Sequence, residues 1–410
     1  MIVKRETTER DSSQRDSSQH ESSQQDSSGG VDLVTVAVRP GPVTGMTVAT
    51  GAVIDALAEL GDVRSFALEN GYQKPGRIWA FRKSINAIAG ALWLLLGKGR
   101  VGHTVYLCPN AGWGLWQTLL HTLVAKWTRR RVVLHHHVCS YSNDHSRLMA
   151  CVQNRLDDGD VNLMLAEEMS TGMRRYQSRA QAFELPYGYL VDAPEYNRKL
   201  APISKERPLV LGHLSNLTFE KGLAEVLQLT GQLVAADVPV RLCLAGPAHH
   251  AAEREAIAAA QRELGDAMQY LGPVYGTEKT KFFEAIDVFL MPTRYKNEAQ
   301  PIVIVEALGC GIPVLATRQG CIASLVGRRG GHTVESADDF VDFAMGWIRK
   351  WVESPPDFRD ACRQAGQRGE TFIEFSKTQL RTVVAGALRP PSQADDKNSS
   401  EGFEQTAPRG

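Results

Sequence analysis

The stretch from Asn297 to Thr317 constrains the fold of this chain more than any other part of the sequence. Pro301 is followed there by four consecutive bulky apolar residues, and Gly309 and Gly311 come shortly before Pro313. Proline is favoured at the first position of a helix, whereas glycine followed by proline ends one. The stretch therefore predicts a loop, a buried helix, a turn and a buried strand, in that order.

Two glutamates flank the start of this predicted helix. Glu306 lies on a helix otherwise built of apolar side chains, so its charge needs a partner. Glu298 comes just before the helix and can reach a different part of a ligand. An ionised carboxylate only accepts hydrogen bonds, and its two oxygens can hold a vicinal diol. An ion-paired Glu306 and a solvated Glu298 would explain the same pattern without a ligand.

The start of this helix is also a candidate anion site. Gln300 is a weak capping residue, so the first N–H groups of the helix are predicted to lack a side-chain partner. Free N–H groups at a helix N-terminus can receive an anion.

The bulk composition describes an ordinary soluble globular protein with room for two domains. The chain has 410 residues, of which 43% are hydrophobic, and its 46 basic residues equal its 46 acidic residues in number. This balance gives no net field that would favour nucleic acid as a partner. Seven cysteines without a Cys-x-x-Cys pair favour reduced thiols in a cytoplasm. The longest apolar run is too short to span a bilayer.

Composition and pattern divide the chain into six parts. The first part repeats a Ser-Ser-containing unit of five residues with no apolar side chain to bury, so it is predicted to be a disordered tail, and the polar C-terminal end is read in the same way. The predicted parts are the tail 1–30, an N-terminal domain 31–193, a polar linker 194–208, a C-terminal domain 209–376, a helix 377–389 that returns toward the first domain, and the tail 390–410.

The N-terminal domain opens with a strand, a Gly/Pro loop and a helix, which is the start of a βαβ unit. Gly45 ends this loop and can let the backbone approach a phosphate or a sugar, although a glycine needed only for the turn fits equally well. The strand 132–134 runs into His135, His136 and His137 at the end that faces the ligand crevice of a parallel sheet. Side chains alternate along a strand, so the three histidines cannot share one metal, and one of them is expected to point into the crevice.

Residues 78–96 form a predicted amphipathic helix with two tryptophans and several basic neighbours. Its apolar residues share one helical face: they are Ile78, Phe81, Ile85, Ile88, Leu92 and Leu95. Such a helix can lie on an anionic membrane. A helix that packs this face against the protein core is the simpler interpretation, because every surface helix of a globular domain shows the same spacing.

The C-terminal domain repeats strands and helices from residue 209. Lys221 precedes Gly222 at the start of a predicted helix, where a point cation and free N–H groups suit a diphosphate, although a solvated lysine is the common case. Gly320 follows the strand 314–316, and a glycine turn there offers backbone N–H groups to an anion. Two consecutive βα domains place a cleft between them, and each presents the carboxyl ends of its strands to that cleft.

An ordered set of motifs connects this pattern to a known family. The motifs are Gly212 with Lys221-Gly222, Leu244-Ala-Gly246, Tyr270-Leu-Gly272, Asp287 to Pro292, Asn297-Glu298 followed after seven residues by Glu306-Ala-Leu-Gly-Cys-Gly-Ile-Pro-Val, and Ala316-Thr317 with Gly320. Together they resemble the retaining glycosyltransferases of family 4. The resemblance implies an α/β protein of the GT-B fold, with two Rossmann-like βαβ domains facing each other across a cleft and disordered termini.

The resemblance also implies roles for single residues. Glu306 would hold the ribose hydroxyls of the donor nucleotide, and Glu298 would contact the donor sugar near its anomeric carbon. Lys221 would bind the diphosphate, with the Gly45 loop near the same phosphates. His137 is the preferred histidine beside the reacting sugar.

One position departs from the family pattern. The family usually carries an arginine where this chain has His213, and the spacing from there to Lys221 is longer than the commonest form. The second cation for the diphosphate is therefore not assigned by the motif. His213, Arg294 and Arg318 are the candidates.

The implied function is that of a retaining, metal-independent hexosyltransferase. Its donor would be a UDP-, GDP- or ADP-sugar, with no further cofactor and no metal, and its acceptor a saccharide or a lipid-linked saccharide in polysaccharide or lipopolysaccharide biosynthesis. The enzyme would work in the cytoplasm, with the helix 78–96 able to contact the inner face of the membrane. Two alternatives are a non-catalytic protein of the same fold that binds nucleotide sugars and a nucleotide-sugar epimerase.

Overall fold

The computed structural model describes most of the predicted folded region. It covers residues 33–37, 45–59, 61–68, 77–96, 103–192 and 203–387. The predicted tails 1–30 and 390–410 and part of the predicted linker lie outside the described residues.

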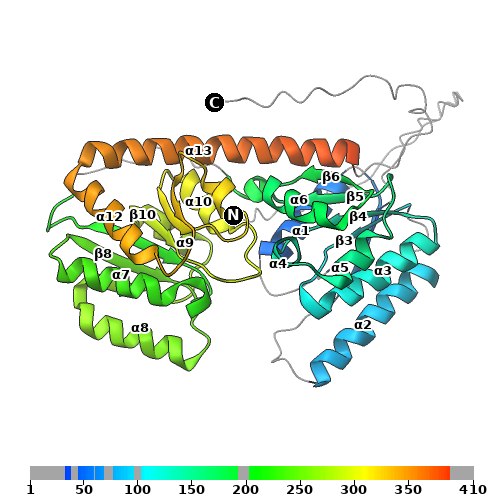
Figure 1. Cartoon of the computed structure of the whole chain (residues 1–410), viewed down its shortest axis with the longest axis horizontal. Coiled ribbons are helices and arrows are strands. Elements are labelled where there is room, and N and C mark those ends of the chain that lie inside the picture. The colour runs from blue at the N-terminus through cyan, green and yellow to red at the C-terminus, as the bar shows by residue number, and fades with distance from the viewer. Residues whose placement is uncertain are drawn as a thin grey trace, which may run out of the picture.

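Two parallel sheets of six strands organise the molecule, one in each lobe (Figure 1). The first sheet has the order β2-β1-β3-β4-β5-β6, with β1 (Leu33–Ala37), β2 (Val63–Ala67), β3 (Thr104–Leu107), β4 (Arg131–His135), β5 (Val161–Met164) and β6 (Gln181–Glu184). The second has the order β12-β11-β10-β7-β8-β9, with β7 (Leu209–Leu214), β8 (Val240–Ala245), β9 (Met268–Tyr270), β10 (Val288–Met291), β11 (Val314–Thr317) and β12 (Gly331–Val334). The two-domain α/β prediction is confirmed.

Helices flank both sheets (Figure 1). The first lobe contains α1 (Gly45–Ala58), α2 (Arg77–Leu96), α3 (Leu115–Trp127), α4 (Ser140–Asn143), α5 (Arg147–Gln153) and α6 (Glu167–Met173). The second contains α7 (Leu223–Ala235), α8 (Ala251–Leu264), α9 (Thr277–Ala285), α10 (Ile302–Gly309), α11 (Ile322–Val326), α12 (Phe340–Glu353) and α13 (Pro355–Thr382). The central strands β4, β5, β10 and β11 are almost entirely buried. Parallel strands covered on both faces need this nearly continuous apolar sequence.

A single long helix, α13, connects the lobes. It starts beside α12 and continues past the second sheet to the first lobe (Figure 1). A π-helical turn, Val383–Ala387, follows it, and Val383 and Val384 pack in the same cluster as Leu33 and Val53 of the first lobe. The predicted helix 377–389 therefore begins inside α13, because no strong helix breaker separates it from the residues before it.

The segments after the strands of both sheets meet at the junction of the lobes. Gln300 Oε1 accepts a hydrogen bond from the Tyr187 amide at 2.6 Å, and Gln300 Nε2 donates to the Leu165 carbonyl at 3.2 Å. The Sγ atoms of Cys139 and Cys321 lie 3.7 Å apart. Each contact joins a segment that follows a strand of the first sheet to one that follows β10 or β11. The carboxyl ends of the two sheets therefore face each other.

Within the described residues, no helix combines the length and apolar content needed to cross a bilayer.

The crossing of α10 and α13 gives a test of this packing. A Cβ placed on Gly369 would lie 2.4 Å from the Leu308 carbonyl carbon, whereas a Cβ on Gly346 of α12 meets no atom within 4 Å. We expect Gly369→Ala to lower the free energy of unfolding by about 1–3 kcal/mol, because backbone atoms cannot make room as side chains do. The matched Gly346→Ala should be neutral or stabilising by up to about 1 kcal/mol. Urea denaturation of both variants measures this, and equal midpoints would contradict the described packing.

Candidate functional site

Lys221 and Glu298 form an ion pair at the carboxyl end of the second sheet. Lys221 Nζ lies 2.5 Å from Glu298 Oε2, and it also lies 4.7 Å from the centre of the Tyr295 ring. Glu298 is only 8% exposed, and the Thr293 hydroxyl donates a second hydrogen bond to the same oxygen at 3.4 Å. A buried carboxylate needs such partners. The lysine that precedes the α7 helix and the glutamate that precedes α10 are thus brought together.

The two loops that carry this pair are fixed by glycines with positive φ. Gly222 has φ +91°, and a Cβ there would lie 2.5 Å from the Pro292 carbonyl oxygen. Gly320 has φ +60°, and a Cβ there would lie 2.3 Å from the Glu298 carbonyl oxygen. Only glycine fits either position. Gly320 thereby holds the turn after β11 against the backbone of Glu298, so the loops after β7, β10 and β11 converge.

Glu306 lies on α10 and pairs with a residue that the sequence analysis did not select. Lys279 Nζ of α9 lies 2.6 Å from Glu306 Oε1. Glu306 Oε2 is buried and has no hydrogen-bond partner among the described residues. Burial raises the pKa of Glu306, and the Lys279 ammonium partly opposes that rise. One oxygen of this carboxylate is therefore paired, and the other can still accept a hydrogen bond.

The N-terminus of α10 lies against the first lobe. The helix starts at Ile302 with Pro301 as its N-cap and without a side-chain cap. The prediction that Pro301 occupies the first helical position was off by one residue, since Pro301 has the extended ψ of 117°. A Cβ on Gly45 would lie 3.4 Å from Ile302 Cδ1. Gly45, at the start of α1, thus faces the start of α10.

His137 is the histidine of the triplet that lies nearest to this junction. Its Nδ1 lies 2.5 Å from the Tyr187 hydroxyl and its Nε2 lies 3.3 Å from the Thr50 hydroxyl. Burial lowers the pKa of His137 to about 3, and His136 adds to the effect. His137 is therefore neutral at physiological pH, and both of its nitrogens have partners.

The other two histidines of the triplet form hydrogen bonds within the first lobe. His136 hydrogen-bonds with the Tyr141 hydroxyl and with Asn162 Oδ1, both at 2.9 Å. His135 Nδ1 lies 2.6 Å from the Tyr106 hydroxyl inside the core. Among the described residues, no group of three His, Cys, Asp or Glu side chains has the arrangement of a metal site.

His213, a predicted donor-binding residue, lies inside the second sheet. Its Nδ1 donates to the Leu290 carbonyl at 2.9 Å, and its Nε2 accepts from the Ser215 hydroxyl at 2.8 Å. Burial lowers the pKa of His213 to about 4. A neutral histidine with both nitrogens engaged does not supply the missing cation.

The two arginine candidates have acidic partners of their own. Arg294 pairs with Glu225 and, at 3.2 Å, with Asp338. Arg318 pairs with Glu335 at 2.5 Å, and both side chains are at least half exposed. Arg294 comes from the same loop as Glu298, so it is the candidate nearer to the Lys221 pair in the sequence.

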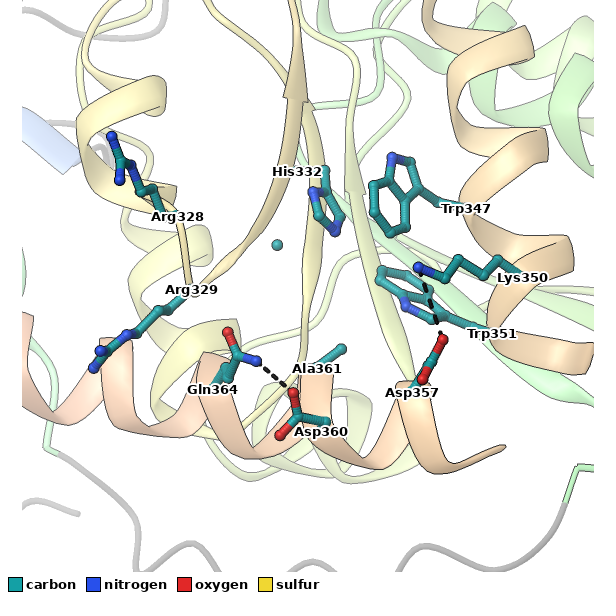
Figure 2. Close-up of a pocket in the computed structure, with 11 residues that line it drawn as sticks. Arg328, Arg329, His332, Trp347, Lys350, Trp351, Asp357, Asp360, Ala361 and Gln364 are labelled. Carbon is teal, nitrogen blue, oxygen red and sulfur yellow. Dashed lines mark hydrogen bonds and ion pairs between the residues drawn. The ribbon is translucent and has the colours of Figure 1, made fainter. Parts of the chain in front are cut away.

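A cavity among the described residues lies away from this site. It measures about 250 Å³ and is formed by β12, α12 and α13. Figure 2 shows His332 beside Trp347, whose ring centres are 3.3 Å apart, with Lys350 and Asp357 on the same side. None of the predicted site residues lines this cavity, so the candidate site rests on the convergence of the loops and not on a cavity.

The C-terminal part of the chain is similar to a known family. Residues 197–369 match the family described as glycosyl transferases group 1. The matched range contains Lys221, Glu298, Glu306 and Gly320.

Curated relatives match over part of the chain. A GDP-mannose-dependent monoacylated alpha-(1-6)-phosphatidylinositol monomannoside mannosyltransferase of Corynebacterium glutamicum is 26% identical over 167 residues, which cover 40% of this chain and 42% of the relative. A D-inositol 3-phosphate glycosyltransferase of Pseudarthrobacter chlorophenolicus is 36% identical over 88 residues, 20% of each chain. The chain thus spans less than half the length of these relatives.

Solved structures show the same fold over most of the chain. HepE of Anabaena, solved with UDP and glucose, has a TM-score of 0.63 at 16% identity, covering 86% of this chain and 99% of that one. Sucrose-phosphate synthase of Thermosynechococcus elongatus gives the same score, identity and coverage. The two parallel sheets and their flanking helices are those of the GT-B fold.

The ion pair of Lys221 and Glu298 predicts a stability effect. Lys221→Ala leaves Glu298 buried beside only Thr293, so we expect the free energy of unfolding to fall by about 1–3 kcal/mol. Lys205→Ala removes a lysine whose pair with Asp237 is largely exposed, and should change stability little. Urea denaturation compares the two variants. Equal effects would mean that the Lys221 pair is as weak as a surface pair.

Buried neutral histidines predict a loss of stability in acid. Burial holds the pKa of His136 and His213 at about 4 and that of His137 at about 3, below the ordinary value of 6.5. The unfolded chain therefore binds more protons below pH 6.5. Stability is fully present above that pH and falls with it by about 1.4 kcal/mol per pH unit for each histidine, until the pH reaches the folded pKa.

Urea midpoints at several pH values between about 6 and about 5 measure this slope. His213→Gln should reduce the pH dependence of the free energy of unfolding by the contribution of one histidine, about 1.4 kcal/mol per pH unit. His250→Gln, at an exposed position, should leave that dependence unchanged. A slope that is the same in all three proteins would contradict the neutral, buried state of His213.

Proposed function

We propose that this chain is a retaining, metal-independent hexosyltransferase of the family 4 type. The observation that carries the proposal is the convergence of Lys221, Glu298 and Gly320 from three loops at the carboxyl ends of neighbouring strands. In open α/β sheets this edge is where ligands bind. Its donor would be a UDP-, GDP- or ADP-sugar, with no further cofactor. HepE, which shares the fold, was solved with UDP and glucose, which supports this class of donor.

Each part of the donor has a candidate partner in this arrangement. Glu306 Oε2 is buried without a partner, and the two ribose hydroxyls would supply donors to it. The diphosphate would lie near Lys221 and the uncapped N-terminus of α10, where an ammonium and backbone N–H groups attract anions. Gly45 lies beside that helix end, so its backbone would be close to the phosphates. Glu298 would contact the sugar near its anomeric carbon.

The proposed transfer step is the one that the resemblance to the retaining family implies. The bond between C1 of the sugar and the diphosphate oxygen breaks, and a bond from C1 to the acceptor oxygen forms on the same face. The proton of the acceptor hydroxyl passes to the leaving diphosphate, so no side-chain base is required. Lys221 and the helix N-terminus stabilise the charge that develops on the leaving group. His137, neutral and held by Tyr187 and Thr50, would position the sugar without exchanging a proton.

The acceptor proposed is a saccharide or a lipid-linked saccharide of polysaccharide or lipopolysaccharide biosynthesis. One relative is a mannosyltransferase whose name gives a phosphatidylinositol mannoside, which is a lipid-linked sugar. A cytoplasmic location, at the inner face of a membrane, would suit such an acceptor.

A second candidate is a protein that binds nucleotide sugars without transferring them. The buried, neutral His213 favours it, because the position then supplies no second cation to the leaving group. Calorimetry with UDP-, GDP- and ADP-sugars, followed by a product search over a broad acceptor panel, separates the two. Binding without transfer or hydrolysis would favour the second candidate, and formation of an isomeric donor would indicate an epimerase.

The transfer function predicts the effect of single substitutions. With the donor identified by calorimetry, Glu298→Gln and Lys221→Ala should each lower turnover by about 100-fold or more, because each removes charge stabilisation at the reacting centre. Lys205→Ala is the matched control and should keep the full rate. NMR of the product should show the anomeric configuration of the donor, and EDTA should not lower the rate. Near wild-type rates in both site variants would contradict the assigned roles.

A further inference from the structure

The α2 helix carries an apolar stripe that no part of the described structure covers. Phe81, Ile85, Ile88, Leu92 and Leu96 follow the helical repeat, and all five are exposed, from 48% for Ile85 to 79% for Leu96. The simpler interpretation of this helix, that the apolar face packs on the core, was therefore wrong for these residues. The helix is instead held to the first lobe by its opposite face.

That opposite face consists of small side chains and one leucine. Ala87, Ala91 and Leu94 are buried, and the Ala87 carbonyl hydrogen-bonds with His121 of the neighbouring helix α3 at 2.9 Å. Trp93 packs beside Phe66 of β2, with ring centres 5.6 Å apart. The helix is thus attached to the domain mainly through this face, and the stripe stays exposed.

Further large apolar side chains are exposed beside this helix. Trp113, two residues before α3, and Trp127, the last residue of α3, are 87% and 78% exposed. Figure 1 places α2 and α3 at the outer side of the first lobe, with α2 far from the second lobe. Single exposed apolar residues are normal, but a stripe of five with two tryptophans nearby marks an interaction surface.

The segment of the sequence that contains the stripe carries charges of one sign. From Asn70 to Asn143 the sequence has ten Lys or Arg residues and no Asp or Glu, although the whole chain is balanced. Arg82 and Arg129 are exposed, and Lys83 Nζ lies 5.0 Å from the centre of the Trp79 ring. An apolar stripe with basic and tryptophan neighbours fits an interface between acyl chains and anionic headgroups.

We propose that α2 docks the protein on an anionic lipid membrane, with the stripe inserted among the acyl chains and the basic residues on the headgroups. The charge decides between occupants, because a second copy of this chain would place the same basic segment against itself. Docking requires neither donor nor acceptor. The proposed function enters only as the reason for docking, which would be to bring a lipid-linked acceptor to the site.

Co-sedimentation of the full chain with vesicles tests this inference. The wild-type protein should bind vesicles of phosphatidylcholine with phosphatidylglycerol and should bind phosphatidylcholine alone weakly. The double variant Ile85→Ser/Leu92→Ser should bind roughly tenfold less or weaker still, because two inserted side chains are lost. Arg82→Glu/Arg129→Glu should abolish the dependence on phosphatidylglycerol. Val234→Ser/Phe375→Ser, at comparably exposed positions away from α2, is the matched control and should bind as the wild type does.

Three results would overturn the inference. They are no binding by the wild type, equal binding by the Ile85/Leu92 variant, and a dimer in analytical ultracentrifugation that this variant abolishes, which would identify a second copy as the occupant. Calorimetry with nucleotide sugars on the same variant keeps the two proposals apart. If the Ile85/Leu92 variant loses vesicle binding but still binds the donor, the substitutions affect the membrane surface alone. If the wild type binds no donor, the proposed function is wrong, whatever the vesicles show.

Discussion

The loop from Thr293 to Pro301 is the element on which both lobes depend. Glu298, near its end, pairs with Lys221 of the second lobe, and two residues later Gln300 binds the Tyr187 amide and the Leu165 carbonyl of the first. Both side chains are buried, so each must keep its partners or leave an unpaired polar group behind. Glu298, which is proposed to contact the donor sugar, and Gln300, which joins the lobes, are therefore parts of one short segment.

This arrangement couples the site to the relative position of the lobes. Glu298 cannot move far, because the Gly320 turn packs on its carbonyl and the Cys321 amide donates to the Ala299 carbonyl at 2.8 Å. A donor that draws Lys221 toward its phosphates would take away part of the pairing of Glu298. A shift of the loop would then also move Gln300, whose hydrogen-bond partners belong to the other lobe. A ligand can shift such an equilibrium only by contacts that differ between the two arrangements, and this exchange of partners is such a difference.

Local signals in the sequence predicted the sheets and the helix α10 well. A buried parallel strand is a run of consecutive apolar residues, and a glycine followed by a proline marks the end of a helix. The partners of the site were harder to predict. Lys279 pairs with Glu306 across 27 positions, and nothing near Lys279 distinguishes it from a solvated lysine. His213 shows the opposite case, since it was a candidate because it stands where the family has an arginine, and the structure has it hydrogen-bonded inside the sheet. The edge strands β2 and β12 were missed because half-exposed strands lack a continuous apolar run.

The helix α2 shows why a hydrophobic repeat does not by itself identify the buried face. Ala87, Ala91 and Leu94 are buried, whereas the larger residues Phe81 and Leu92 are exposed. Small side chains allow close packing of two helices, so the buried face can be the less hydrophobic one. The net charge of the whole chain is also a poor guide to its surface. The 410 residues are balanced in charge, yet residues 70–143 contain no Asp or Glu. A nucleic acid would match the charge of this segment but not an exposed stripe of Phe, Ile and Leu, whereas an anionic lipid surface matches both.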